Sequence, residues 1–260
     1  NTKNDIQIGL MHAEYFAGIA KYDFGSIVKK IDDKSSFGFS FLRFGVDNIP
    51  NTTDLIDAQG NLNYDRITYF SAADMAFIGS YGKKISDYLS IGGSVKIINR
   101  TAGDFAQAWG FGLDLSTTYQ KNNWGFAIVA RDVTSTFNVW NYQLTDEMIN
   151  VFNTTGNELP QNGLELTLPR IILGINKKYQ LEENVSLLLE FNSDLTTDGQ
   201  RNTLISANPF SLDPHLGAEV NIKNIVYLRG GIGNIQKTPD LTGKMIYTLQ
   251  PNLGLGINIK

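Results

Sequence analysis

The chain of 260 residues contains no cysteine, which excludes disulfide bonds, iron–sulfur clusters and zinc sites with thiolate ligands. Charged residues make up only 18%, against about 25% in an average soluble domain. Two histidines leave little for metal binding or proton transfer, and the formal net charge of −4 argues against a strongly basic nucleic-acid-binding surface. We therefore expect no catalytic residues, no metal, no cofactor and no nucleic-acid partner. No apolar run approaches the ~18–20 residues of a membrane helix.

Glycine and aromatic residues are plentiful: there are 25 glycines, and aromatics reach 11%. Hydrophobicity repeats with a period of two, which is the period of a β-strand. The clearest case is Ala108–Gln120, where small or polar residues at even positions alternate with Trp109, Phe111, Leu113, Leu115, Thr117 and Tyr119. The mean hydropathy of −0.16 does not exclude a membrane protein, because only every second residue of a transmembrane β-barrel faces lipid.

About 12 segments of this kind follow one another along the chain. Most are longer than the ~5–6 residues of a typical globular strand, and a tilted strand needs about 9–11 residues to cross a bilayer. Their approximate spans are 5–14, 17–31, 35–47, 68–84, 87–101, 105–120, 123–134, 165–179, 184–195, 212–223, 225–236 and 249–260.

Connections between the segments alternate in length from the second segment onward. The short ones are 32–34, 85–86, 121–122, 180–183 and 224, and the long ones are 48–67, 102–104 (long by position only), 135–164, 196–211 and 237–248. Bacterial outer-membrane barrels combine short periplasmic turns with longer extracellular loops. The alternative is a soluble sandwich or lipocalin-like barrel, but the second face is rich in Gly, Ser, Thr, Asn and Gln rather than Lys and Glu. We therefore predict one domain, 1–260, that forms an all-β, antiparallel, up-and-down transmembrane β-barrel in the bacterial outer membrane.

The alternation of side chains along each predicted strand, called here strand parity, places a small set of charged residues on the polar face, which is the expected lumen. Two interpretations remain open: internal ion pairs that close a narrow barrel, which we favour because unpaired charge away from water is costly, or the lining of a solute path. The predicted lumen residues are Lys96, Arg100, Arg131, Glu190, Glu219 and Arg229.

Several blocks resemble the PorV/PorQ family of Bacteroidetes, which is itself similar to FadL-type outer-membrane barrels. They are Gln7–Lys21, Ser40–Thr52, Ala130–Tyr142, Thr155–Tyr179 and Pro214–Val220. The resemblance implies a 14-stranded barrel without known enzymatic activity, associated with type IX secretion, and it is closest to a PorV-like paralogue. With about 12 strands visible, we expect both chain ends to be incomplete. The implied partners are outer-membrane lipid, the type IX translocon barrel or other secretion components, and secreted cargo domains.

The connection 135–164 carries an unusual amount of apolar surface for a loop. Thr145 is a candidate N-cap of a short helix, with Asp146 and Glu147 in its first turn. The loop either packs as a lid over the barrel mouth or binds a partner. The predicted partner-binding residues are Phe137, Trp140, Tyr142, Met148, Ile149 and Phe152. We expect a non-enzymatic adaptor of type IX secretion or surface attachment; the alternative is a FadL-like transporter of hydrophobic small molecules.

Overall fold

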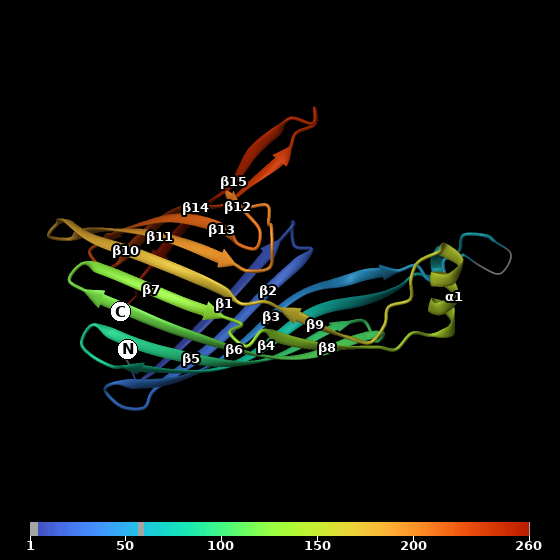
Figure 1. Ribbon diagram of the computed structural model, residues 1–260, viewed down its shortest axis with the longest axis horizontal. Helices are drawn as coiled ribbons and strands as arrows, with labels where there is room; N and C mark the ends of the chain where they lie inside the picture. The colour runs from blue at the N-terminus through green and yellow to red at the C-terminus, as the bar shows by residue number, and fades with distance from the viewer. Residues whose placement is uncertain (1–4, 57–59, 260) are drawn as a thin grey trace. The chain divides into compact units, whose positions relative to one another are not determined.

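The computed structural model describes residues 5–56 and 60–259 and consists almost entirely of one 15-stranded sheet (Figure 1). Most strands that neighbour each other in the chain also pair in the sheet, in an antiparallel manner. The hydrogen-bonded path runs through β1 (Ile6–Tyr15), β2 (Ala20–Lys30), β3 (Ser35–Asn51), β4 (Thr68–Lys84), β5 (Leu89–Ala102), β6 (Ala106–Lys121), β7 (Trp124–Arg131), β10 (Arg170–Glu182), β11 (Val185–Thr196), β13 (Ser211–Ile222), β14 (Val226–Pro239) and β15 (Met245–Ile257).

The three remaining strands lie off this path: β8 (Thr136–Tyr142), β9 (Gly163–Thr167) and the short β12 (Ile205–Ser206). The all-β, antiparallel, up-and-down prediction is confirmed, and within the described residues the twelve strands of the path correspond to the twelve predicted segments. The expectations of 14 strands, of a single domain over 1–260 and of incomplete chain ends stay predictions. Neither α1 (Asp146–Thr155) nor the 3-10 helix Tyr64–Arg66, the two helices of the described ranges, is long and apolar enough to cross a membrane.

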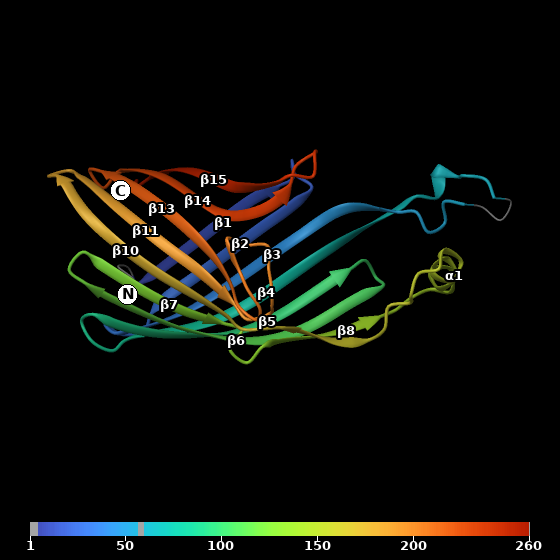
Figure 2. The same cartoon turned by 45° about the horizontal axis from the view of Figure 1, so that its top comes forward.

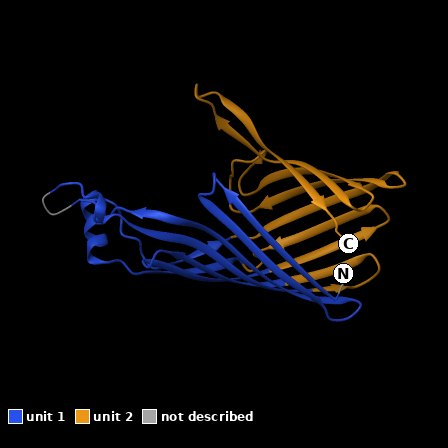
Figure 3. Ribbon diagram, turned by 180° about the vertical axis from the view of Figure 1, so that it is seen from behind, with its two compact units in different colours: residues 1–81, 94–113, 135–167 blue, residues 82–93, 114–134, 168–260 orange. Residues whose placement is uncertain are grey.

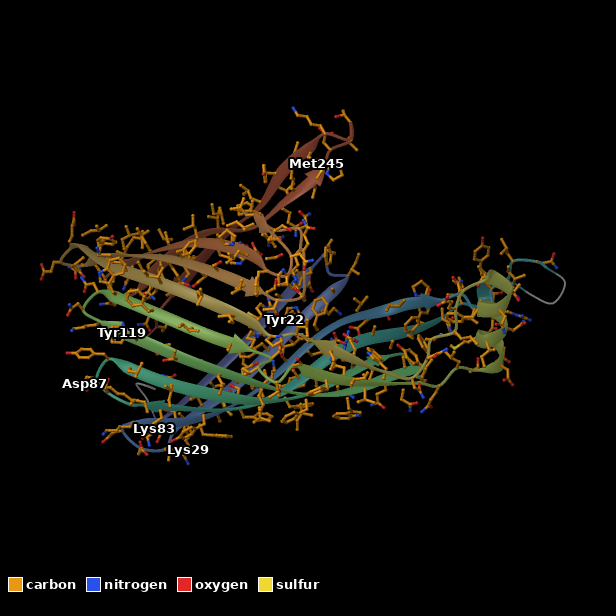
Figure 4. All side chains as sticks on the ribbon, in the orientation of Figure 1. Tyr22, Lys29, Lys83, Asp87, Tyr119 and Met245 are labelled. Atoms are coloured by element: carbon orange, nitrogen blue, oxygen red, sulfur yellow. The ribbon has the colours of Figure 1, made fainter. Side chains whose placement is uncertain are left out.

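The chain forms two compact units, which Figure 3 shows in different colours. Unit 1 comprises residues 1–81, 94–113 and 135–167, and it contains α1, β8 and β9. Unit 2 comprises residues 82–93, 114–134 and 168–260, and it contains β7 and the strands from β10 to β15. Within unit 2, Figure 4 shows Lys83, Asp87 and Tyr119 gathered at one end, where the short connections β4–β5 and β6–β7 lie.

Burial in the sheet is the reverse of that in a soluble protein. Among the described residues, the buried hydrophobic side chains are three alanines: Ala20, Ala106 and Ala108. Large apolar side chains lie exposed along the strands, for example Leu115 at 56% and Leu216 at 53%. The buried polar residues are Ser35, Lys96, Asn99, Asp132, Thr136, Asn138, Ser186, Ser193, Thr196, Ser211 and Asn221. Over most of its strands the sheet therefore has a half-buried polar face and an exposed apolar face, called here the inner and outer faces.

The prediction of a single loop over 135–164 is wrong. Residues 136–142 form β8, which pairs with β6 from Ala106 to Phe111, and β9 pairs with β8 (Figure 1). The irregular connection is shorter, 143–162, and contains α1. Three of the predicted partner-binding residues, Phe137, Trp140 and Tyr142, thus belong to a strand.

The reason is a local change of register. On β6, Leu115 pairs with Ala130 of β7, and Phe111 pairs with Phe137 of β8. These two positions are four residues apart on β6, but their partners are seven residues apart in the chain. Three extra residues are inserted, and Asp132 and Ser135 on either side of this insertion have positive φ. An odd insertion moves the following side chains to the other parity, so outward positions are even in β7 and odd in β8. The alternation of apolar and polar residues that predicts β7 is therefore interrupted at the insertion, and it does not predict β8.

The predicted helix is confirmed as α1 (Asp146–Thr155). The Thr145 hydroxyl accepts a hydrogen bond from the Met148 backbone N–H at 3.3 Å, and the acidic Asp146 and Glu147 occupy the first turn. Gly156 ends the helix with φ 71°, a left-handed conformation that glycine adopts without steric cost.

Candidate functional site

The outer face of β6 shows the dimensions of the apolar band. From Trp109 to Tyr119 the outward side chains are bulky, and the two ends of the run are aromatic. Ten residues rise about 33 Å along a strand, and a tilt of ~40° reduces this to about 25 Å, which is the height of the apolar band of an outer-membrane barrel. Tryptophan and tyrosine at both ends match the aromatic girdles that lie at membrane–water interfaces.

Aromatic side chains and lysines alternate at the short-turn end of the outer face in unit 2. The Lys177 Nζ lies 4.5 Å from the ring centre of Trp124 and 4.8 Å from that of Tyr179. A second lysine, Lys121, places its Nζ 5.2 Å from the ring centre of Tyr88. Lysines with apolar stems and ammonium groups at the headgroup level are typical of a membrane interface.

The inner face of unit 1 holds a cluster around the predicted lumen residue Arg100. Its Nε donates to Asp74 at 2.9 Å, and its Nη1 donates to both carboxylate oxygens of Glu165 at 3.0 and 2.9 Å. The indole N–H of Trp140 donates to Glu165 at 2.7 Å, and the Arg100 guanidinium lies 5.0 Å from the Trp140 ring centre. The Trp140 ring stacks on Tyr142 at 5.8 Å. Trp140 and Tyr142 therefore face inward.

Lys96 is 4% exposed and lies on the same inner face. Its side chain and the Thr136 hydroxyl lie directly over Gly112, where an added Cβ would come within 2.1 Å of the Thr136 Oγ1 and 3.2 Å of the Lys96 Cε. Gly110 makes the same space for Asn138. Glycines on the inner face of β6 thus let side chains of β5 and β8 fill the space close to the backbone.

The other predicted lumen residues lie in unit 2. Arg229 and Glu219 are directly opposite in the β13–β14 register, and the Arg229 Nε donates to Glu219 at 2.6 Å. Glu190 accepts a hydrogen bond from the side-chain amide of Asn192 at 2.5 Å. Arg131 lies exposed at the end of β7, opposite Arg170 on β10. Arg100, Glu219 and Arg229 therefore sit in ion pairs, whereas Arg131 is at an exposed strand end.

In strands β1 to β3 of unit 1 the two faces exchange polarity halfway along. The face that carries Ile8, Ile27 and Phe39 at the short-turn end becomes charged toward the other end, where His12 Nδ1 contacts Asp23 at 2.7 Å and Arg43 donates to Asp47 at 2.9 Å. The opposite, inner face becomes apolar at the same level. Its apolar residues there are Met11, Ala13, Tyr15, Tyr22, Phe24, Leu42 and Phe44.

These inner-face aromatics form a cluster that no single strand reveals. Phe44 contacts Tyr15 edge to face at 6.2 Å between ring centres, and Tyr22 lies 6.4 Å from Phe44. Tyr15 is 45% exposed and Phe44 37%. Reading β3 alone, the change from Phe37, Phe39 and Phe41 to Arg43 and Asp47 on one parity was the signal for this exchange.

The predicted partner-binding residues separate into two groups. Phe137 points outward, is 40% exposed and lies opposite Leu166 of β9. Met148, Ile149 and Phe152 of α1 are half-buried. With Trp140 and Tyr142 turned inward, the six residues do not form one surface.

No protein-family model matches the chain, and no curated protein matches it either. Among solved structures, it is similar to a Pseudomonas aeruginosa FadL homologue at 14% identity, over 84% of this chain and 60% of that one, with a TM-score of 0.44. It is also similar to the outer membrane transporter YddB from Escherichia coli at 10% identity, over 90% of this chain and 36% of that one, with a TM-score of 0.38. The chain thus spans about 60% and 36% of the lengths of these two proteins. Neither similarity assigns a ligand to this chain.

Proposed function

We propose that the chain is an integral β-barrel protein of a bacterial outer membrane, without enzymatic activity. The inverted burial supports this: large apolar residues are exposed on the outer face while Lys96, Asn99 and Asn138 are buried. In water such a surface is far larger than the few hundred Å² of apolar patch that monomers tolerate. In lipid it is the expected outer wall of a closed antiparallel sheet.

Within that membrane, the barrel conducts hydrophobic small molecules. The observation that carries this proposal is the aromatic cluster of Tyr15, Tyr22 and Phe44 on the inner face, toward the end of the strands where the longer connections lie. A water-filled lumen gains nothing from exposed aromatic rings, whereas an apolar solute that leaves water is stabilised by contact with them.

Uptake of a radiolabelled long-chain fatty acid into cells that carry the protein tests this proposal. The variant Phe44→Asp places a carboxylate in the cluster, and we expect uptake to fall several-fold. Phe44→Leu keeps the surface apolar and should retain uptake. The control Phe39→Leu changes an outward residue of the same strand. Equal uptake by Phe44→Asp and the unchanged protein, at equal amounts in the membrane, contradicts a hydrophobic conduit.

A second proposal, made on the resemblance to the PorV/PorQ family, is an adaptor role in type IX secretion or surface attachment. One feature of the structure favours it: α1 carries Met148, Ile149 and Phe152 half-buried on a ten-residue helix between β8 and β9. Amphipathic helices at a barrel rim are suited to docking onto another protein. The partners it implies are the translocon barrel, other secretion components or secreted cargo domains.

Affinity purification from membranes with a triple Met148→Ser, Ile149→Ser, Phe152→Ser variant tests the adaptor role. We expect secretion components to be lost from the purified sample. A matched control replaces exposed polar residues of the same helix, Asn150→Ser and Asn153→Ser. Equal recovery of partners with the triple variant counts against docking through α1.

A further inference from the structure

A groove of about 680 Å³ crosses the outer face of unit 2. It is lined mainly by outward side chains from β7, β10, β11, β13, β14 and β15, and Asn176, Glu190 and Asn252, of the opposite parity, also contribute to the lining. Figure 2 shows the strands from β10 to β15 side by side. Its lining residues include Trp124, Lys177, Leu189, Ala218, Gly230 and Leu253. We call this the outer groove.

The register explains why a groove exists on a face that is otherwise bulky. Lys177, Leu189, Ala218, Gly230 and Leu253 form one row across five paired strands. The rows on either side are large: Ile175, Phe191, Leu216, Ile232 and Pro251 on one, and Tyr179, Leu187, Val220, Leu228 and Leu255 on the other. Two adjacent small residues, Ala218 and Gly230, thus form a floor between two apolar walls.

The groove has one charged end. Lys177 is the outward lysine of the row, and its ammonium group lies between the rings of Trp124 and Tyr179. Among the residues that the structure describes, no carboxylate is paired with Lys177, and its ammonium group contacts these two rings. Aromatic faces stabilise the cation while leaving N–H donors directed away from the protein.

The dimensions fit an extended hydrocarbon chain with an anionic group at one end. From Lys177 to Leu253 the row crosses four strand spacings, about 19 Å at ~4.8 Å per strand. Along that distance the two flanking rows are apolar apart from the Tyr179 hydroxyl, and Lys177 lies at the level of the aromatic residues next to the short turns. In outer-membrane barrels the short turns are periplasmic. The cation therefore faces the headgroups of the inner leaflet, which is where phospholipids lie.

We propose that the outer groove is a binding site for a phospholipid, with an acyl chain against Ala218 and Gly230 and the phosphate on the Lys177 ammonium. This rests on the proposed membrane embedding of the sheet. The site is distinct from the inner face: the lipid stays on the outside of the barrel and is not the solute that the lumen conducts. The contact between the Lys177 ammonium and the phosphate is a charge-assisted hydrogen bond, in which lysine acts as a compact positive charge.

Quenching of Trp124 fluorescence by brominated lipids measures occupancy directly, because Trp124 lines the groove. The chain has 3 tryptophans, and Trp109→Phe with Trp140→Phe leaves Trp124 as the sole emitter. The full chain is reconstituted in phosphatidylcholine vesicles, and brominated phosphatidylglycerol is titrated in. Folding of each variant is checked by heat-dependent migration in gels. We expect half-maximal quenching of Trp124 at a mole fraction of brominated phosphatidylglycerol several-fold lower than the value for lipids that mix at random around the protein.

Four variants separate the parts of the site. Lys177→Gln should remove the preference for the anionic lipid, and the double variant Ala218→Val, Gly230→Val should remove the tight component altogether by filling the floor. An added Cβ at Gly230 is 3.8 Å from the nearest Leu253 carbon, so the change is sterically mild. Lys121→Gln is the matched control for Lys177→Gln, because Lys121 also lies over an aromatic ring. Gly79→Val is the control for the floor variant, because it adds a side chain at an outward glycine outside the groove that has open space around it. Both controls should behave as the parent.

The outcomes are distinguishable. If no brominated lipid quenches Trp124 in any variant, the sheet is not embedded and the proposed function fails. If quenching is the same for all variants and follows random mixing, the protein is embedded but the outer groove holds no specific lipid. If lipopolysaccharide displaces the brominated lipid while unlabelled phosphatidylglycerol does not, the assignment to a phospholipid is overturned.

Discussion

Arg100 on β5 and Glu165 on β9 are 65 residues apart in the chain, and the Arg100 Nη1 donates to both oxygens of the Glu165 carboxylate. The same carboxylate accepts from the Trp140 indole on β8. One acidic side chain thus connects three strands on the inner face of unit 1. Among the described residues, the five-residue β9 forms its ladder with β8 alone, so the Arg100 contact is a side-chain link from β9 to a strand with which it does not pair.

Replacing Glu165 with Gln should therefore loosen this hairpin. The amide keeps an acceptor for Trp140 but loses the charge that holds Arg100, and we expect a loss of about 1–3 kcal/mol in unfolding free energy. Denaturant unfolding in vesicles measures the change. Glu158→Gln, at an exposed position in the connection 143–162 that precedes β9, is the control. A stability equal to that of the parent for Glu165→Gln would show that the cluster is not stabilising.

Strand parity was the part of this structure that the sequence revealed most directly. For β6 the predicted span 105–120 is within one residue of Ala106–Lys121, and Trp109 and Leu115 lie on the predicted face. Such agreement follows from the period of two, which holds wherever no residue is inserted. β8 was missed because three inserted residues reverse the parity at Asp132–Ser135.

The candidate sites depended on pairing between strands, which one sequence does not contain. Arg100 was predicted on the inner face, but its partners Asp74 and Glu165 are set by the register of other strands. The outer groove requires that Ala218 and Gly230 lie opposite each other. Neither residue is unusual in its own strand.

A charge on the outer face distinguishes a membrane-embedded sheet from a soluble one. Leu115 is 56% exposed and lies near the middle of the outward run of β6, and the next residue, Ser116, points inward. Leu115→Arg should cost about 2–4 kcal/mol at the bilayer midplane. Ser116→Arg, one residue away on the other face, should cost much less. Unfolding in vesicles measures both, and equal costs argue against lipid at Leu115.

The N-cap of α1 gives a local test of the connection 143–162. Thr145→Ala removes the hydroxyl that accepts from the Met148 N–H, and such a change costs about 1 kcal/mol of helix stability. Amide hydrogen exchange within α1 should rise about fivefold, while exchange in β8 stays the same. Thr154→Ala, inside the helix, is the control, because its hydroxyl bonds to the Asn150 carbonyl without capping a free N–H. Unchanged exchange in Thr145→Ala means that tertiary contacts, not the cap, hold the helix.

The turn between β14 and β15 contains a carboxylate that should titrate at unusually low pH. The pKa of Asp240 is lowered from 3.8, first by the hydrogen bond from the Thr242 hydroxyl at 2.7 Å and then by the backbone N–H groups of Thr242 and Lys244. Since the folded pKa is depressed, the stability that this carboxylate adds to the turn is present above pH 3.8 and is lost as the pH falls through the lower folded value.

Carbon-13 NMR of the Asp240 carboxyl measures the midpoint of its titration. Thr242→Val removes the strongest of these hydrogen bonds, so the midpoint should rise toward the ordinary value. Thr238→Val, which changes a threonine two residues before Asp240, should leave the midpoint in place. A midpoint that is the same in Thr242→Val and in the parent would mean that the hydroxyl does not hold the carboxylate and that the turn is ordered by its backbone alone.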